Sequence, residues 1–254
     1  MAAPVPVVFN EALNLTTVGV AAESIKFGST SMESEKFITI CDSSSGTPQL
    51  VIVDLSAGNA VKKRPIKAEA AIMNPVSEVI ALRSGTALQI FNLELQARMK
   101  STTMTEPVVF WRWTSTNNIA LVTATAVYHW SIEGESAPAK VFDRHQSLGA
   151  GVQIINYQMS GDGKWSLLMG IKAGEGGNVD GQMQLYSMDK RVSQVLQGHS
   201  GVFTTITPEG RTDPAQVLCF EEKKPNEPAK IYVMEVGREQ KEGTFRIPAQ
   251  NIPV

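Results

Sequence analysis

A two-strand pattern that recurs five times along the chain constrains the fold more than any other feature of the sequence. Its tightest copy spans residues 79–94, where one apolar run ends at Ser84-Gly85 and a second begins at Leu88. β-branched and aromatic residues on both sides of a glycine-containing break are typical of a β-hairpin. The first strands are expected at 37–40, 79–82, 118–123, 165–171 and 217–220, and the second at 51–56, 89–94, 128–133, 184–189 and 231–236.

Each pair is preceded by a polar turn and a further expected strand. These leading strands are expected at 24–27, 69–73, 108–113, 153–159 and 202–207. A period of ~40–50 residues with three or four strands per unit is typical of β-propeller blades. We therefore predict an all-β single domain over 1–254, with blades at roughly 24–66, 67–107, 108–150, 151–198 and 199–247. The longest interval between second strands is ascribed to an exposed glycine-rich loop at 172–181.

Composition narrows the class of protein. The chain has 254 residues, 43% of them hydrophobic, and a formal net charge of −2, which disfavours a dedicated nucleic-acid binder. No window approaches the ~20 consecutive apolar residues of a membrane span, and residues 1–15 do not have the pattern of a secretory signal. Cys41 and Cys219 lie in apolar strand contexts and are predicted to be buried free thiols of a cytoplasmic protein.

The sequence contains no convincing catalytic constellation. His129 is expected to be a core histidine beside Trp130, and His145 part of a loop hydrogen-bond network. His199 follows a glycine as in Trp-Asp repeats, but the matching Trp-Asp dipeptide is absent. No paired cysteines, His-Glu motif or phosphate loop is present, so we predict a non-enzymatic protein with no cofactor and no metal site. Two alternatives stay open: an enzyme acting on a small molecule in the central channel of a propeller, and a structural fragment without ligand binding.

A peptide-binding surface is the better hypothesis. Cationic residues gather around the first and second units at Lys62, Lys63, Arg64, Arg83, Arg98 and Lys100. In an alternating strand, Gln89 and Phe91 project to one face while Ile90 and Asn92 project to the other. A polar and an aromatic side chain below a rim of cations suit an extended peptide with alternating apolar residues and an acidic end. A solvated basic edge next to a core phenylalanine explains the same pattern equally well.

Several segments together resemble the N-terminal domain of clathrin heavy chain. They are SMESEKFI (31–38), RPI (64–66), AIMNP (71–75), LQIFN (88–92), VYHWSIEGES (127–136), FDRH (142–145), QIINY (153–157) and MQLYS (183–187). The resemblance runs from about residue 9 to the last residue. It implies a seven-bladed β-propeller, followed by a helical leg, that captures short linear motifs of endocytic adaptor and accessory proteins.

From the resemblance we expect a cytoplasmic protein of coated pits and coated vesicles that binds other clathrin chains through the leg. We expect no nucleic-acid partner and no direct membrane insertion. About five of the seven implied blades are present, so the array is predicted to be incomplete, with apolar faces uncovered on its first and last blades.

The resemblance also implies three binding sites. The groove between blades one and two, for acidic-hydrophobic clathrin-box motifs, comprises Arg64, Ile80, Ala87, Gln89, Phe91, Gln96 and Arg98. The axial pocket, for tryptophan-containing motifs, comprises Phe27, Gln153, Ile155 and Ile171. The groove between blades four and five comprises Trp165, Leu185, Lys190, Ser193 and Gln194, although a core role for Trp165 is as compatible with the sequence.

This chain departs from the family pattern at four of these positions. Ala87 replaces a usual threonine, Gln96 and Arg98 replace usual lysines, and Lys190 replaces a usual arginine. Ala87 removes a hydroxyl and Gln96 removes a cation, so we expect weaker binding of acidic motifs in the groove between blades one and two. Lys190 keeps the charge of an arginine but not its planar fork.

Overall fold

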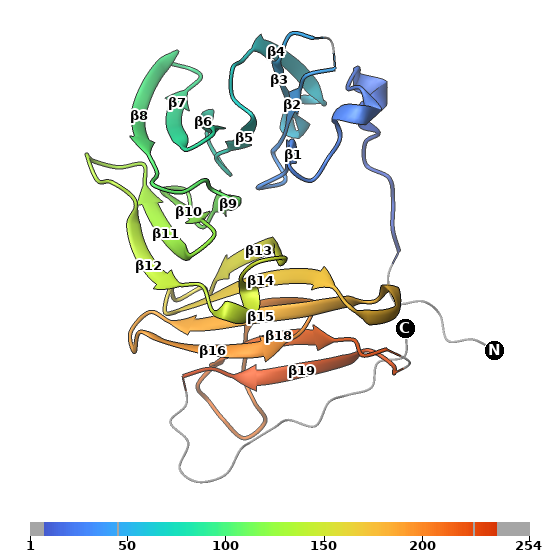
Figure 1. Ribbon diagram of the computed structural model, residues 1–254, viewed down its shortest axis with the longest axis vertical. Helices are drawn as coiled ribbons and strands as arrows, with labels where there is room; N and C mark the ends of the chain where they lie inside the picture. The colour runs from blue at the N-terminus through green and yellow to red at the C-terminus, as the bar shows by residue number, and fades with distance from the viewer. Residues whose placement is uncertain (1–7, 45, 226, 238–254) are drawn as a thin grey trace, which may run out of the picture. The chain divides into compact units, whose positions relative to one another are not determined.

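The computed structural model describes residues 8–44, 46–225 and 227–237, and it is organised as a series of antiparallel sheets (Figure 1). There are five sheets among these residues, four with four strands and one with three, and each lies within one of the sequence ranges expected for a blade. The described residues contain short 3₁₀ turns and no α-helix. The prediction of an all-β chain built from propeller-type blades is confirmed. The chain divides after Thr103 into two compact units, which are described separately below.

Sheet A opens unit 1 and consists of β1 (Thr30–Ser31), β2 (Phe37–Asp42), β3 (Gln49–Asp54) and β4 (Ala60–Pro65). It follows two 3₁₀ turns, η1 (Leu15–Val18) and η2 (Ala22–Ser24). The leading strand expected at 24–27 is wrong, because the carbonyl of Lys26 accepts hydrogen bonds from the Ser29 and Thr30 amides and closes a turn there. Only the two residues of β1 then pair with β2.

Sheet B completes unit 1 and contains β5 (Ala70–Met73), β6 (Val79–Ser84), β7 (Ala87–Asn92) and β8 (Ala97–Thr103). Ser84 pairs with Ala87, so the turn of the β6–β7 hairpin is Gly85-Thr86, one residue later than expected. Gly85 has φ = 57°, a conformation that glycine adopts without steric cost at the first position of a two-residue turn.

Sheets C and D begin unit 2. Sheet C contains β9 (Phe110–Trp113), β10 (Asn118–Val122), β11 (Ala126–Ser131) and β12 (Ala139–Asp143), and the turn η4 (Gln146–Leu148) follows it. Sheet D contains β13 (Gln153–Met159), β14 (Trp165–Ala173), β15 (Val179–Ser187) and β16 (Val192–Gln197).

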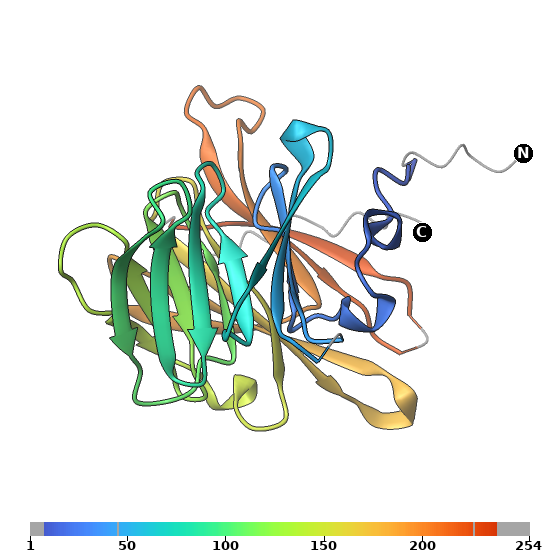
Figure 2. The same ribbon diagram turned by 90° about the horizontal axis from the view of Figure 1, so that it is seen from above.

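The segment 172–181 is mostly exposed, as expected, but only part of it is a loop. Lys172 pairs with Asp180 and Ala173 with Val179, so β14 and β15 continue into it as a projecting hairpin. Only residues 174–178 form the connection, which includes the turn η5 (Glu175–Gly177) (Figure 2, yellow-orange hairpin). Gly174, Gly176 and Gly177 therefore lie at the tip of a hairpin, whereas Gly181 lies within β15.

Sheet E closes the described part of unit 2 with β17 (Ser200–Ile206), β18 (Ala215–Glu222) and β19 (Lys230–Glu235). The expected end of the fifth blade at 247 and the tail AQNIPV (249–254) lie outside the described residues, as do residues 1–7.

The sequence pattern missed the fourth strand of sheets A to D. These strands are β4, β8, β12 and β16, and most of their residues are exposed or half-buried. An outer strand with little buried surface has no hydrophobic alternation to reveal it, whereas the inner strands of each sheet are rich in buried apolar residues.

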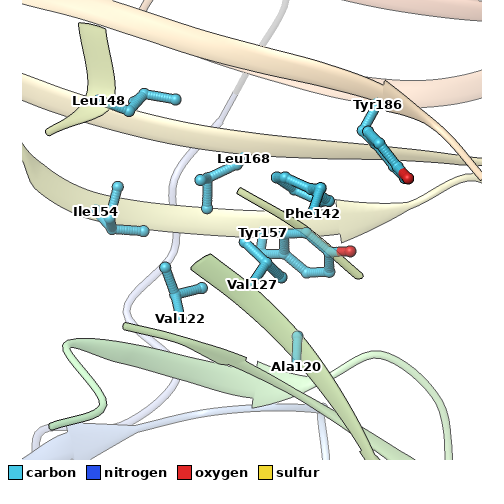
Figure 3. Packing of buried hydrophobic residues seen from close by; sticks show 9 residues of the cluster. All are labelled: Ala120, Val122, Val127, Phe142, Leu148, Ile154, Tyr157, Leu168 and Tyr186. Carbon is cyan, nitrogen blue, oxygen red and sulfur yellow. The ribbon is translucent and has the colours of Figure 1, made fainter. Parts of the chain in front are cut away.

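Apolar clusters fill the space between neighbouring sheets within each unit. In unit 2, one cluster joins side chains of sheets C and D, with Phe142 stacked on Tyr186 at 4.5 Å between ring centroids (Figure 3). Trp111, Trp113 and Trp130 are buried, as expected for core residues. Cys41 and Cys219 are free thiols, as expected, but they are half-buried, so the prediction that they are buried is wrong.

Candidate functional site

Sheets A and B of unit 1 meet along their inner strands. The hydroxyls of Ser31 and Thr39 both donate to the carbonyl of Ala71, at 2.9 and 3.0 Å. An apolar cluster continues outward from this seam, and its buried members are Phe37, Leu50, Ile52, Ala71, Met73, Ile80 and Leu93. This cluster is the buried floor beneath the candidate groove, with β4 on one side and β7 and β8 on the other.

The first wall of the groove is β4. Arg64 pairs with Leu50 and Lys62 pairs with Ile52, so each cation shares a face with a buried member of the floor. Directly paired residues of antiparallel strands point to the same side of the sheet. Arg64 is exposed, and its charge therefore lies at the solvent edge of an apolar surface.

The second wall is formed by β6, β7 and β8. Ile80, fully buried, pairs with Phe91, and Phe91 pairs with Arg98 on the outer strand. Gln89 lies two residues before Phe91 and is exposed, whereas Ile90 between them is buried on the opposite face. The structure thus brings an amide, a half-buried aromatic ring and a guanidinium onto one face directed at sheet A.

A cavity of about 370 Å³ lies at the Gln89 end of this groove. Its lining residues are Ile66, Lys67, Ala68, Leu82, Arg83, Ser84, Ala87 and Gln89. Six of these were not among the residues expected for the groove: Ile66, Lys67, Ala68, Leu82, Arg83 and Ser84. The pairing of Leu82 with Gln89 is the signal that could have found Leu82, since it follows from the hairpin register.

The other end of the groove is polar. Glu78, which directly precedes β6, forms an ion pair with Lys62, with 2.7 Å between Nζ and Oε1. Gln96 lies in the β7–β8 turn with φ = 52° and is exposed, as is Arg98. Arg64 and Arg98 form no ion pair with any residue of the described ranges, so their charges are available to an incoming anion.

The Cys41 thiol lies at the edge of the floor. Burial raises its pKa to about 11, an effect that the nearby Arg83 guanidinium partly offsets. The thiol is therefore protonated at neutral pH and behaves as an apolar group.

The residues expected for an axial pocket are divided between the two units. Phe27 belongs to unit 1, where it is 61% exposed. Gln153, Ile155 and Ile171 belong to unit 2, where Gln153 pairs with Ile171 and Ile155 lies at a β-bulge. The three residues of unit 2 are neighbours in sheet D.

The residues expected between blades four and five are on sheet D and the turn that precedes β16. Leu185, Gln194 and the half-buried Trp165 share the face that packs toward sheet E. Ser193 instead pairs with Tyr186 on the opposite face, where its hydroxyl accepts a hydrogen bond from Gln184 at 2.8 Å. Lys190 is exposed in the turn. The strand alternation thus separates Ser193 from the other strand residues of this set.

The histidines have structural partners. His129 hydrogen bonds through Nε2 to the hydroxyl of Tyr157 at 2.8 Å, and burial holds its pKa below the usual value. His145 bonds Ser147, and His199 bonds the backbone of Val179 and Lys223. Within the described ranges, no group of three or more His, Cys, Asp or Glu side chains could hold a metal ion, and no helix is long and apolar enough to cross a membrane.

Comparison with known proteins identifies relatives at high identity. Clathrin heavy chain 2 of Homo sapiens is 48% identical over 238 residues, and clathrin heavy chain of Drosophila melanogaster is 46% identical over 237. A probable clathrin heavy chain of Schizosaccharomyces pombe is 39% identical over 245 residues. These alignments cover 94%, 93% and 96% of this chain and 14% of each relative, so the chain spans about one seventh of their length.

No family model matches the chain. Among solved structures, the β-propeller domain of Cps50 (Swd1) from Myceliophteria thermophila aligns with 89% of this chain and 87% of that one, at 10% identity and a TM-score of 0.47. The relatives match nearly the whole sequence. This chain therefore belongs to the clathrin heavy chain family, as a homologue of the N-terminal region of the heavy chain.

Proposed function

We propose that this chain is a non-enzymatic, peptide-binding propeller domain that recruits endocytic adaptor and accessory proteins to clathrin coats. The expected ligand is a short acidic-hydrophobic motif, and the expected location is the cytoplasmic side of coated pits and vesicles. Assembly with other clathrin chains through a leg belongs to the same proposal. Blades at roughly 24–66, 67–107, 108–150, 151–198 and 199–247 would together form this domain.

One observation carries the proposal: an apolar cluster between sheets A and B that reaches the surface at the half-buried Leu82 and Phe91, with exposed arginines on both sides. Arg64 extends from β4 and Arg98 from β8, and both are paired with floor or wall residues of the same groove. An extended peptide can place alternate apolar side chains against the half-buried Phe91 and in the cavity beside Gln89. Its carboxylate can then accept charge-assisted hydrogen bonds from a guanidinium.

A calorimetric titration tests the proposal. A peptide with the order leucine, apolar, any residue, apolar, acid should bind the chain with micromolar affinity, because such an interface is small. Arg64→Ala should weaken binding by about 1–2 kcal/mol, as expected for a partly exposed charge-assisted contact. If wild type and the Arg64→Ala, Gln89→Ala double variant bind with equal affinity, the groove between sheets A and B is not the site.

A further inference from the structure

The ion pair between Lys62 and Glu78 lies within the candidate groove. Lys62 is two residues from Arg64 on β4, so the two cations point to the same side of sheet A. Its partner across the strand pair, Ile52, is part of the buried floor. The ammonium nevertheless contacts a carboxylate of the facing sheet, with side chains 46% and 25% exposed for Lys62 and Glu78. Lys62 is thus a groove-facing cation whose charge is already matched.

Glu78 is presented by a firmly held backbone. Its carbonyl accepts a hydrogen bond from the Leu93 amide at 2.8 Å, and the Asn74 amide donates to the carbonyl of the following Val79 at 2.7 Å. The Asn74 side chain caps the same turn by accepting from the amides of Val76 and Ser77, each at 3.1 Å. Lys62, by contrast, carries its charge on a flexible four-carbon stem. The lysine can therefore turn away while the glutamate backbone stays in place.

Glu78 also lies at the end of sheet B that carries Arg98. The adjacent Val79 pairs with Asn92, Asn92 pairs with Ala97, and Arg98 follows. A carboxylate fixed there lowers the local positive potential and competes for Lys62 with any acidic side chain that arrives at this end. Lys36 lies in the same region, with Nζ on the carbonyl of Val76 at 3.0 Å.

We propose that Glu78 is an internal competitor that sets the selectivity of the groove for acidic peptides. The proposal rests on the proposed function. A peptide carboxylate takes the place of Glu78 on Lys62, and part of its binding energy is offset by the loss of the existing ion pair. Lys62 and Glu78 thereby determine how strongly the groove distinguishes an acidic peptide from its neutral analogue. Peptides with several carboxylates at this end are favoured over peptides with one.

The test titrates the full chain with an acidic peptide and with the same peptide in which each acid is replaced by its amide. Glu78→Gln should tighten binding of the acidic peptide roughly two- to fivefold, the scale of an exposed charge pair, and leave the amide analogue unchanged. In the Lys62→Gln background the gain from Glu78→Gln should be clearly smaller, because the competition for Lys62 is absent and only charge repulsion remains. Glu78→Asp keeps the negative charge and should resemble wild type.

Glu227→Gln is the matched control. Glu227 pairs with Lys230 at the same 2.7 Å, and it lies in unit 2 between β18 and β19. The substitution should change neither titration. Thermal melts of each variant show whether the fold is retained.

The possible outcomes separate the two proposals. No gain from Glu78→Gln, an equal gain for both peptides, or a gain that Lys62→Gln does not diminish overturns the role of Glu78, even where the acidic peptide binds wild type well. A wild-type chain that binds neither peptide rejects the proposed function itself, and the role of Glu78 with it.

Discussion

Truncation of Ile80 should strongly destabilise unit 1, because this side chain supports the floor of the groove. It is fully buried and lies on the middle strand pair of sheet B, paired with Met73 on β5 and Phe91 on β7. Isoleucine-to-alanine changes in cores cost about 2–5 kcal/mol, and the cost is larger where the neighbours cannot collapse into the cavity. Strands on both sides hold this site open, so we expect a loss of about 3–4 kcal/mol for Ile80→Ala.

Urea unfolding followed by far-ultraviolet circular dichroism, with hydrogen exchange of residues 70–103, measures this loss. All four tryptophans lie in unit 2, at positions 111, 113, 130 and 165, so their fluorescence serves as a separate probe of that unit. Ile80→Val should cost about 0.5–1.5 kcal/mol, and Val76→Ala, at a side chain 58% exposed, less than about 0.5. A loss below about 1 kcal/mol for Ile80→Ala would refute the packing described for the floor.

Two further predictions concern charge. Burial lowers the folded-state pKa of His129 below its ordinary value near 6.5. Below pH 7 the unfolded state therefore binds a proton more readily than the folded state does. The free energy of unfolding should fall as the pH drops from 7 to 5. Thermal melts of wild type and His129→Gln between pH 7 and pH 5 check this. The melting temperature of the variant should change less with pH than that of wild type, and an equal pH dependence would contradict the prediction. Gln96→Lys should tighten binding of an acidic peptide by about 0.3–1 kcal/mol and increase its salt dependence, because a rim charge is screened. Titrations at low and high salt that show no response would mean that position 96 faces away from the ligand.

The sequence predicts the strands that bury apolar side chains, because those side chains give a recognisable hydrophobic pattern. The sequence predicts β13 at 153–159, for example, where the apolar Ile154 and Tyr157 are buried and Ile155 and Met159 are half-buried. The outer strand β4 was missed because five of its six residues are exposed and its composition follows no burial pattern. The region 24–27 contains strand-like residues, but a turn closed by the Lys26 carbonyl replaces the expected strand.

The groove likewise contains residues that the sequence predicts and residues that it cannot predict. Strand alternation alone put Gln89 and Phe91 on one face, and the hairpin register fixes their partners Leu82 and Ile80. Glu78 could not be found in this way, because it lies outside a strand and its ion pair depends on how sheet A packs on sheet B. The position of Ser193 shows the limit of inference by resemblance, since local alternation turns it away from Leu185 and Gln194.

The most direct test of the central claim is a map of amide chemical-shift changes on adding the acidic-hydrophobic peptide to the isotope-labelled chain. The groove account predicts that the largest changes fall on β4 and on β6 to β8, with Arg64, Gln89 and Phe91 among them. Sheets D and E should change little at peptide concentrations that saturate this site. Changes concentrated in sheets D and E, or no localised changes at saturation, would contradict the assignment of peptide binding to the groove between sheets A and B.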